Sequence, residues 1–183
     1  MKKNKLSKVS KLLFCILMFA TGQLHAEQFC LSTAAVTAPE DEFLKFDNGQ
    51  VLHLSTNLMW MRCSLGQTWT GDECTGEALS LTWKEALNMS VGYEFNESNG
   101  WRLPNVKELA SITERSCARP SINISLFPNT LEDDYWSSTP SLTDPQRAWV
   151  VAFFNSSNSI KEKDRAVFVR LVRTATRAER ELE

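Results

Sequence analysis

Apolar and polar residues alternate on both sides of a short turn signal early in the chain. In FLKFDNGQVLHL, two such runs flank residues 47–49, Asp-Asn-Gly. Asn-Gly between strand-like runs predicts a β-hairpin, because both residues tolerate positive φ. A second turn at residues 55–57 leads into LMWMRC, a further strand that places Trp60 in the core. The pattern therefore predicts an opening of three strands.

Two segments change to a helical period. In LTWKEALNMS, Thr82 and Glu85 have the T-x-x-E spacing of a capping box, in which each side chain satisfies the other residue's backbone N–H. Asn105 and Glu108 repeat this spacing as N-x-x-E before a second apolar stripe. The pattern predicts two helices, the second ending near Arg115.

Residues 100–112, GWRLPNVKELASI, form the joint before the second helix. Trp101 is expected to anchor the core, and Pro104 fixes the direction in which the chain enters the helix. Arg102 is expected to pair with an acid or with loop carbonyls. The stretch is therefore interpreted as structural, with no catalytic role for its arginine.

The last part of the chain shows the clearest strand pattern. YWSSTP, which contains Trp136, reads as a short strand, and AWVVAFFN, SIKEKD and AVFVRLVR follow as three more. In the last of these, Val167, Val169 and Leu171 share one face, and Arg170 lies on the other. The order of strands, two helices, long loops and strands predicts an α+β fold with antiparallel pairing.

The ends of the chain differ from this body. Residues 1–26 combine five lysines, a short apolar run and a small-residue cleavage point, which predicts a secretory signal peptide. A bacterial lipid anchor at Cys15 is a weaker alternative, because bulky Phe14 precedes it. Residues 27–42 are expected to be extended, and residues 174–183 to form a charged, frayed tail. No later segment is apolar enough to span a bilayer, so the chain is expected to be exported to the periplasm or the cell surface.

Charge argues against one class of partner. The whole chain has 20 basic and 22 acidic residues. Removal of the signal peptide takes five lysines and no acid, so the net charge becomes about −7. An acidic protein repels phosphate backbones, which makes nucleic acid an unfavourable partner.

Four cysteines remain after cleavage, and an even count in an exported chain predicts two disulfides. Three connectivities are compatible with the count. Cys63–Cys74 is favoured, because the short loop between them contains two glycines, and this leaves Cys30–Cys117. One bridge with two free thiols is an alternative, as is a zinc site, although the chain has no CxxC pair.

Several of these motifs together resemble a known family. The order of TNLMWMRCSLGQTWTGDECTGEALSLTWKEAL, GWRLPNVKELASI, YWSSTP, AWVVAFFN and VRLVR is similar to that of the Lcl C-terminal domain family, over residues 43–173. The resemblance implies a C-type-lectin-like fold in a bacterial exported domain of unknown function. It also implies distant similarity to the formylglycine-generating enzymes. The family's namesake adhesin is implicated in surface attachment and in binding sulfated glycans.

Catalysis has little support. The cysteine pair used by formylglycine-generating enzymes lies late in their domain, and this chain has no cysteine after Cys117. A serine hydrolase needs a base beside its serine. Ser137 and Ser138 are available, but His53 is the one histidine left after signal cleavage. We therefore expect no enzyme activity and no cofactor.

Aromatic, basic and acidic side chains supply the candidate ligand contacts. Trp69 is the best candidate for an exposed contact, because it lies in the polar loop between two cysteines. Arg170 and Arg173 are candidates for an anionic ligand, since arginine binds sulfate in a bidentate manner, although solvated or locally paired arginines are the favoured interpretation. The acidic trio at residues 132–134, Glu-Asp-Asp, is a candidate calcium site, although three adjacent acids on a loop more often form a solvated turn.

These observations favour an exported, non-catalytic binding module that recognises a glycan or a protein at the bacterial envelope. The alternative is a structural or assembly component of an envelope or pilus-like complex without a small ligand. An enzyme is the least favoured class.

Overall fold

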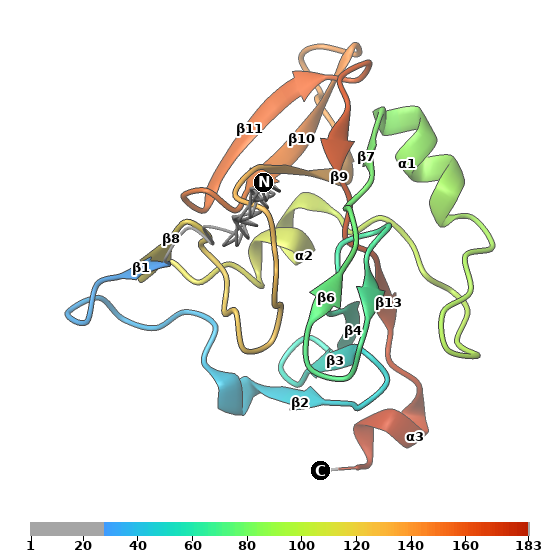
Figure 1. The fold of residues 1–183 in the computed structure, drawn as a ribbon. Helices are drawn as coiled ribbons and strands as arrows, with labels where there is room; N and C mark the ends of the chain where they lie inside the picture. Colours follow the sequence, from blue (N-terminus) through green and yellow to red (C-terminus); the bar gives the residue numbers. More distant parts are fainter. Residues whose placement is uncertain (1–27, 183) are drawn as a thin grey trace, which may run out of the picture.

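The computed structural model describes residues 28–182, and the predicted signal peptide lies outside this part of the chain (Figure 1). The described residues contain the helices η1 (Glu40–Glu42, 3-10), α1 (Trp83–Ser90), α2 (Val106–Ala110) and α3 (Arg177–Arg180). The strands are β1 (Phe29–Cys30), β2 (Phe43–Lys45), β3 (Gln50–His53), β4 (Leu58–Met61), β5 (Thr68–Trp69), β6 (Cys74–Thr75), β7 (Ser80–Leu81), β8 (Cys117–Ala118), β9 (Asp134–Pro140), β10 (Arg147–Ala152), β11 (Ser157–Glu162), β12 (Val167–Phe168) and β13 (Val172–Thr174). The predicted α+β class is confirmed.

A four-stranded antiparallel sheet has the order β13-β4-β3-β2 and contains the predicted three-strand opening. The β2–β3 hairpin turns at Gly49, with φ of 81°, while the next turn uses Asn57 at φ of 56°. All four residues of β4 are buried. Trp60 faces one hydrophobic cluster and Met59 the other, so both faces of this sheet are covered.

A five-stranded sheet has the order β11-β10-β9-β12-β7, with β12 parallel to β9 and the other pairs antiparallel. The predicted last strand is divided between the two sheets, because β12 joins this one and β13 joins the other. Residues 169–171 link β12 to β13. Two of their carbonyls accept hydrogen bonds from Leu65 N, to Val169 O at 2.8 Å, and from Met61 N, to Leu171 O at 3.2 Å. The predicted facing of Val169 and Leu171 is nevertheless confirmed, since both lie in one hydrophobic cluster.

Both predicted capping boxes are present. Thr82 caps α1 with Glu85, and Asn105 caps α2 with Glu108. However, α2 ends at Ala110, five residues before the predicted end. The chain turns inward there to bury Ile112 completely.

The segment before β2 is pinned to the domain at two places. Cys30 forms a disulfide with Cys117, and β1 pairs with β8 across it. Buried Glu114 accepts hydrogen bonds from the backbone N–H groups of Thr37 and Ala38, at 2.9 and 2.8 Å. The pinning by Cys30 expected from the sequence is thus observed.

The prediction of a frayed C-terminal tail is wrong for its first half. Ala175 is buried, and α3 begins at a capping box formed by Thr176 and Glu179.

Within residues 28–182, no helix has the length and apolar character needed to cross a bilayer.

Candidate functional site

A cleft of about 810 Å³ opens between the β5–β6 hairpin and the loop of residues 120–132. This volume is typical of ligand-binding clefts. Amides, hydroxyls and carboxylates line it together with proline and aliphatic side chains. Its polar lining residues include Gln67, Glu73, Thr75, Asn129, Thr130 and Glu132, and its apolar lining residues include Pro120, Ile124, Pro128 and Leu131.

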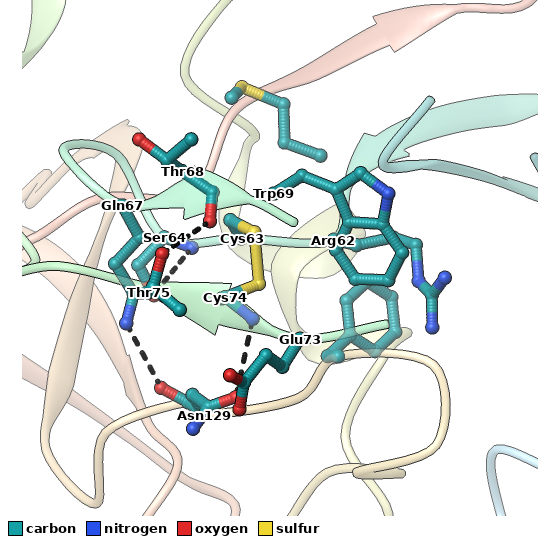
Figure 2. Close-up of a disulfide and its surroundings, with 12 residues drawn as sticks. Arg62, Cys63, Ser64, Gln67, Thr68, Trp69, Glu73, Cys74, Thr75 and Asn129 are labelled. Carbon is teal, nitrogen blue, oxygen red and sulfur yellow. Dashed lines mark hydrogen bonds between the residues drawn. A yellow bond between two sulfur atoms is a disulfide. The ribbon is translucent and has the colours of Figure 1, made fainter. Parts of the chain in front are cut away.

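The hairpin wall is held by the second disulfide, which joins Cys63 to Cys74 as predicted (Figure 2). Both cysteines are buried, with a Cα–Cα distance of 5.4 Å. Cys74 N donates to Asn129 Oδ1 at 3.3 Å, and Gln67 Nε2 donates to Asn129 O at 3.4 Å. Ser64 N donates to Gln67 Oε1 at 3.1 Å. The hairpin and the facing loop are therefore joined at the base of the cleft.

The loop wall is held by two arginines that reach it from the core. Arg62 donates from Nε to Leu126 O at 2.8 Å and from Nη2 to Ser125 O at 2.7 Å. Arg170 donates from Nη2 to Thr130 Oγ1 at 2.7 Å. Backbone carbonyls of a loop need such donors, because the loop has no neighbouring strand to supply them.

The cleft carries negative charge at its rim. Glu73 is exposed on the hairpin and Glu132 is half-buried on the loop. Within the described residues, neither carboxylate forms an ion pair with a lysine or an arginine. A ligand that carries a positive charge would therefore find two available carboxylates.

Arg170 and Arg173 were candidates for contact with an anionic ligand, and their burial contradicts this. Arg170 is fully buried, and Arg173 is 4% exposed. Burial lowers the pKa of Arg170 to about 10, and its partners are carbonyl and hydroxyl oxygens rather than a carboxylate. The sequence pattern indicates one half-exposed strand, whereas Arg170 lies in the link between β12 and β13, and both arginines are covered by neighbouring elements.

Trp69 is less accessible than its polar loop suggested. Its side chain is half-buried, and its indole Nε1 donates to Asp47 O at 2.8 Å. The guanidinium carbon of Arg62 lies 4.1 Å from the ring centroid (Figure 2). A methyl group on Gly49 would come within 2.7 Å of the ring, so the indole packs against this turn. Trp69 fastens the hairpin to the four-stranded sheet and does not line the cleft.

The joint before α2 has the structural character expected of it. Trp101 is buried, and Pro104 is buried beside it in the chain. Arg102 donates to both carboxylate oxygens of Glu108, at 2.8 and 2.7 Å, and Asn105 N donates to the same carboxylate at 2.8 Å. Arg102 thus pairs with an acid, as the sequence suggested.

Trp136, the other aromatic residue singled out in the sequence, is fully buried in β9. Its indole Nε1 donates to Leu81 O at 2.8 Å, which joins β9 to the edge strand β7. It is a packing residue with its one polar atom satisfied.

The three acids of the candidate calcium site serve separate purposes. Glu132 lines the cleft, Asp133 accepts a hydrogen bond from Asp134 N at 2.7 Å, and Asp134 pairs with Lys161 at 3.0 Å. Within residues 28–182, no group of three or more His, Cys, Asp or Glu side chains is arranged to hold a metal ion.

His53 lies beside a serine and a glutamate, but the geometry differs from a proton relay. Ser55 Oγ is 3.0 Å from Nε2, and a Glu42 carboxylate oxygen is 3.7 Å from the same nitrogen. A relay needs the two partners on different ring nitrogens, and buried Nδ1 has no partner. Burial lowers the pKa of His53, and its ring stacks on Phe43 at 4.4 Å. The histidine is part of the core.

Sequence reasoning missed most of the cleft. Residues 116–134 show no strand or helix period, and Gln67 and Thr75 lie in a polar stretch without a recognisable motif. The one available signal was the loop closed by the short disulfide, because such a loop is rigid enough to form a wall.

The model of the Lcl C-terminal domain matches residues 49–173. The chain belongs to the Lcl C-terminal domain family. No curated protein matches it. In this Lcl C-terminal domain, the matched residues include both the β5–β6 hairpin and the loop that faces it, whereas α3 lies outside them.

Proposed function

We propose that this Lcl C-terminal domain is an exported, non-catalytic binding module that recognises a glycan or a protein at the bacterial envelope. The observation that carries the proposal is the cleft beside the Cys63–Cys74 disulfide. Its lining of amides, hydroxyls and carboxylates suits a polar ligand, and its pinned walls favour a site that exists before the ligand arrives.

Two further features support export and a non-catalytic role. Disulfides persist in oxidising compartments, and this domain has two, Cys63–Cys74 beside the cleft and Cys30–Cys117 at the N-terminal segment. The serine and glutamate near His53 share one ring nitrogen, an arrangement that does not suit a hydrolase.

The proposal is tested with glycan and peptide arrays probed by the purified, oxidised protein. Thr75→Tyr puts a large ring into the cleft, while the control Thr68→Tyr changes the residue paired with it across the hairpin, which does not line the cleft. Binding that is lost in Thr75→Tyr and kept in Thr68→Tyr is expected. Absence of binding on every array by the unaltered protein would contradict the proposal and favour the assembly role.

A further inference from the structure

We infer that the ligand of the cleft is an extended, basic polypeptide segment of a partner protein. The inference rests on the proposed binding function and names the chemistry of its ligand. It combines an available backbone acceptor, two carboxylates without cationic partners and an apolar rim.

The backbone acceptor is the carbonyl of Cys74. In the β5–β6 hairpin, Thr70 N donates to Glu73 O at 3.0 Å, and Thr68 pairs with Thr75. Hydrogen-bonded pairs alternate along an antiparallel ladder, so the intervening Trp69–Cys74 pair points its backbone groups away from the hairpin. Cys74 N is taken by Asn129 Oδ1, which confirms this direction.

The Cys74 carbonyl therefore points to the side on which the cleft lies. An extended segment laid along β6 can donate a backbone N–H to it, as in complexes where a peptide adds to a sheet edge. The side-chain amide of Asn129 accepts from Cys74 N in the way that a peptide group of a neighbouring strand would. The Cys74 carbonyl beside it is left for the ligand.

The charges and the rim select the kind of segment. Glu73 and Glu132 stand on opposite walls and attract lysine or arginine side chains. Ile124 and Leu131 are 46% and 39% exposed and offer apolar contacts. Side chains alternate in direction along an extended segment, so one face can meet the carboxylates and the other the aliphatic rim.

A peptide suits this lining better than a sugar. Sugar rings stack on aromatic faces, and none of the cleft-lining residues within 28–182 is aromatic. Pro120, Ile124, Pro128 and Leu131 instead match aliphatic side chains.

The test uses an array of short extended peptides in which valine or threonine alternates with lysine, glutamate or serine, alongside an array of neutral oligosaccharides. The variant Glu73→Lys/Glu132→Lys reverses both rim charges. Its control, Asp72→Lys/Asp133→Lys, makes the same change of net charge at the adjacent residues, which do not line the cleft.

The lysine peptides are expected to bind the unaltered protein, and more weakly in high salt. Reversal of the rim charges is expected to weaken this binding by roughly tenfold or more, and the control by about twofold at most. Equal losses in the two variants would overturn the inference, because they would report only net charge.

Other outcomes separate the inference from the proposed function. Binding of glutamate peptides as tight as that of lysine peptides overturns the inference. Oligosaccharide binding that Thr75→Tyr abolishes, with no peptide bound, overturns it as well but upholds the binding function. Binding on neither array overturns both.

Discussion

The joint before α2 and the joint before α3 use the same residue spacing. Each has an arginine, an N-cap residue three positions later and a glutamate six positions later: Arg102, Asn105 and Glu108 in the first, and Arg173, Thr176 and Glu179 in the second. In both, the glutamate accepts hydrogen bonds from the N-cap backbone and from the arginine, so one carboxylate joins the start of the helix to the residue that precedes it by six positions.

The two joints lie side by side but differ in burial. Arg102 N donates to Val172 O at 2.8 Å, and Val172 N donates back at 3.0 Å, next to Arg173 in the chain. The side chain of Arg102 is 42% exposed, whereas that of Arg173 is 4% exposed. Arg173 also donates to Gln50 Oε1 at 2.7 Å and lies 5.1 Å from the ring centroid of Trp101.

The same local motif therefore contributes differently to the free energy of unfolding in different surroundings. An ion pair in water contributes little, because solvent already stabilises both charges. Removal of one partner from a buried pair is costly, because the other is left without compensation. We therefore expect the joint before α3, which the sequence suggested was frayed, to matter more for stability.

The largest expected effect is that of Arg173→Ala. It leaves Glu179 without its guanidinium partner and the buried amide oxygen of Gln50 without its donor, and we expect the free energy of unfolding to fall by about 3 kcal/mol, as measured by chemical denaturation. The matched control is Arg177→Ala in the same short helix, whose side chain is 86% exposed and which should cost less than about 0.5 kcal/mol. Similar losses in both variants would show that burial is not the deciding factor.

The second prediction uses pH. Hydrogen bonds from Arg173 lower the pKa of Glu179 from 4.5 to about 2. A lowered carboxyl pKa contributes stability that is complete above the unfolded-state value and is lost as the pH falls from about 4.5 towards 2. The full shift corresponds to roughly 3 kcal/mol, and solvent screening of the partly exposed carboxylate makes the contribution smaller. Unfolding measured across this pH window should lose less stability on acidification in Glu179→Gln than in the unaltered protein.

The matched experiment at the first joint sharpens this result. Burial raises the pKa of Glu108, but hydrogen bonds from Arg102 and the Asn105 backbone outweigh it, and the net direction is also down. Because Arg102 is partly exposed, Glu108→Gln should flatten the acid dependence less than Glu179→Gln does. The reverse order would contradict the comparison.

A smaller effect is expected for Arg102→Ala, about 1 kcal/mol in the free energy of unfolding, with a corresponding fall in Tm. Glu108 keeps its bond from Asn105 N, and water can replace the exposed guanidinium. Affinity for a cleft ligand should be unchanged, since Arg102 does not line the cleft. Lost binding with an unchanged Tm would assign Arg102 to the ligand site instead.

The smallest difference is expected between the two caps. Asn105→Ala and Thr176→Ala each remove a side chain that accepts from the helix N3 backbone, and each should cost about 1 kcal/mol. Amide hydrogen exchange checks this locally: faster exchange is expected at Glu108 and Glu179, respectively. Local exchange that stays the same in either variant would show that the cap does not hold that helix start.

Local chemistry made much of the fold predictable. The hairpin at Gly49, the two capping boxes and the pairing of Arg102 with an acid all depend on residues within a few positions of one another. The Thr176–Glu179 box has the same signal, and it was overlooked because the surrounding charges suggested a solvated tail.

The cleft was not predictable in the same way. Its walls come from residues far apart in the chain, and Cys74 meets Asn129 across 55 positions. No periodicity relates such residues, so neither Asn129 nor Thr130 could be recognised as part of a site.

The amino-acid sequence by itself indicated the longer strands, the starts of α1 and α2, a favoured pairing of the cysteines and the family, because each depends on short-range spacing or on the order of motifs. Only the tertiary structure decided which charged side chains are covered. Arg173 lies in β13 and Arg170 in the link between β12 and β13, and both are covered by neighbouring elements. Burial of that kind depends on those elements, which sequence alternation along one segment does not contain.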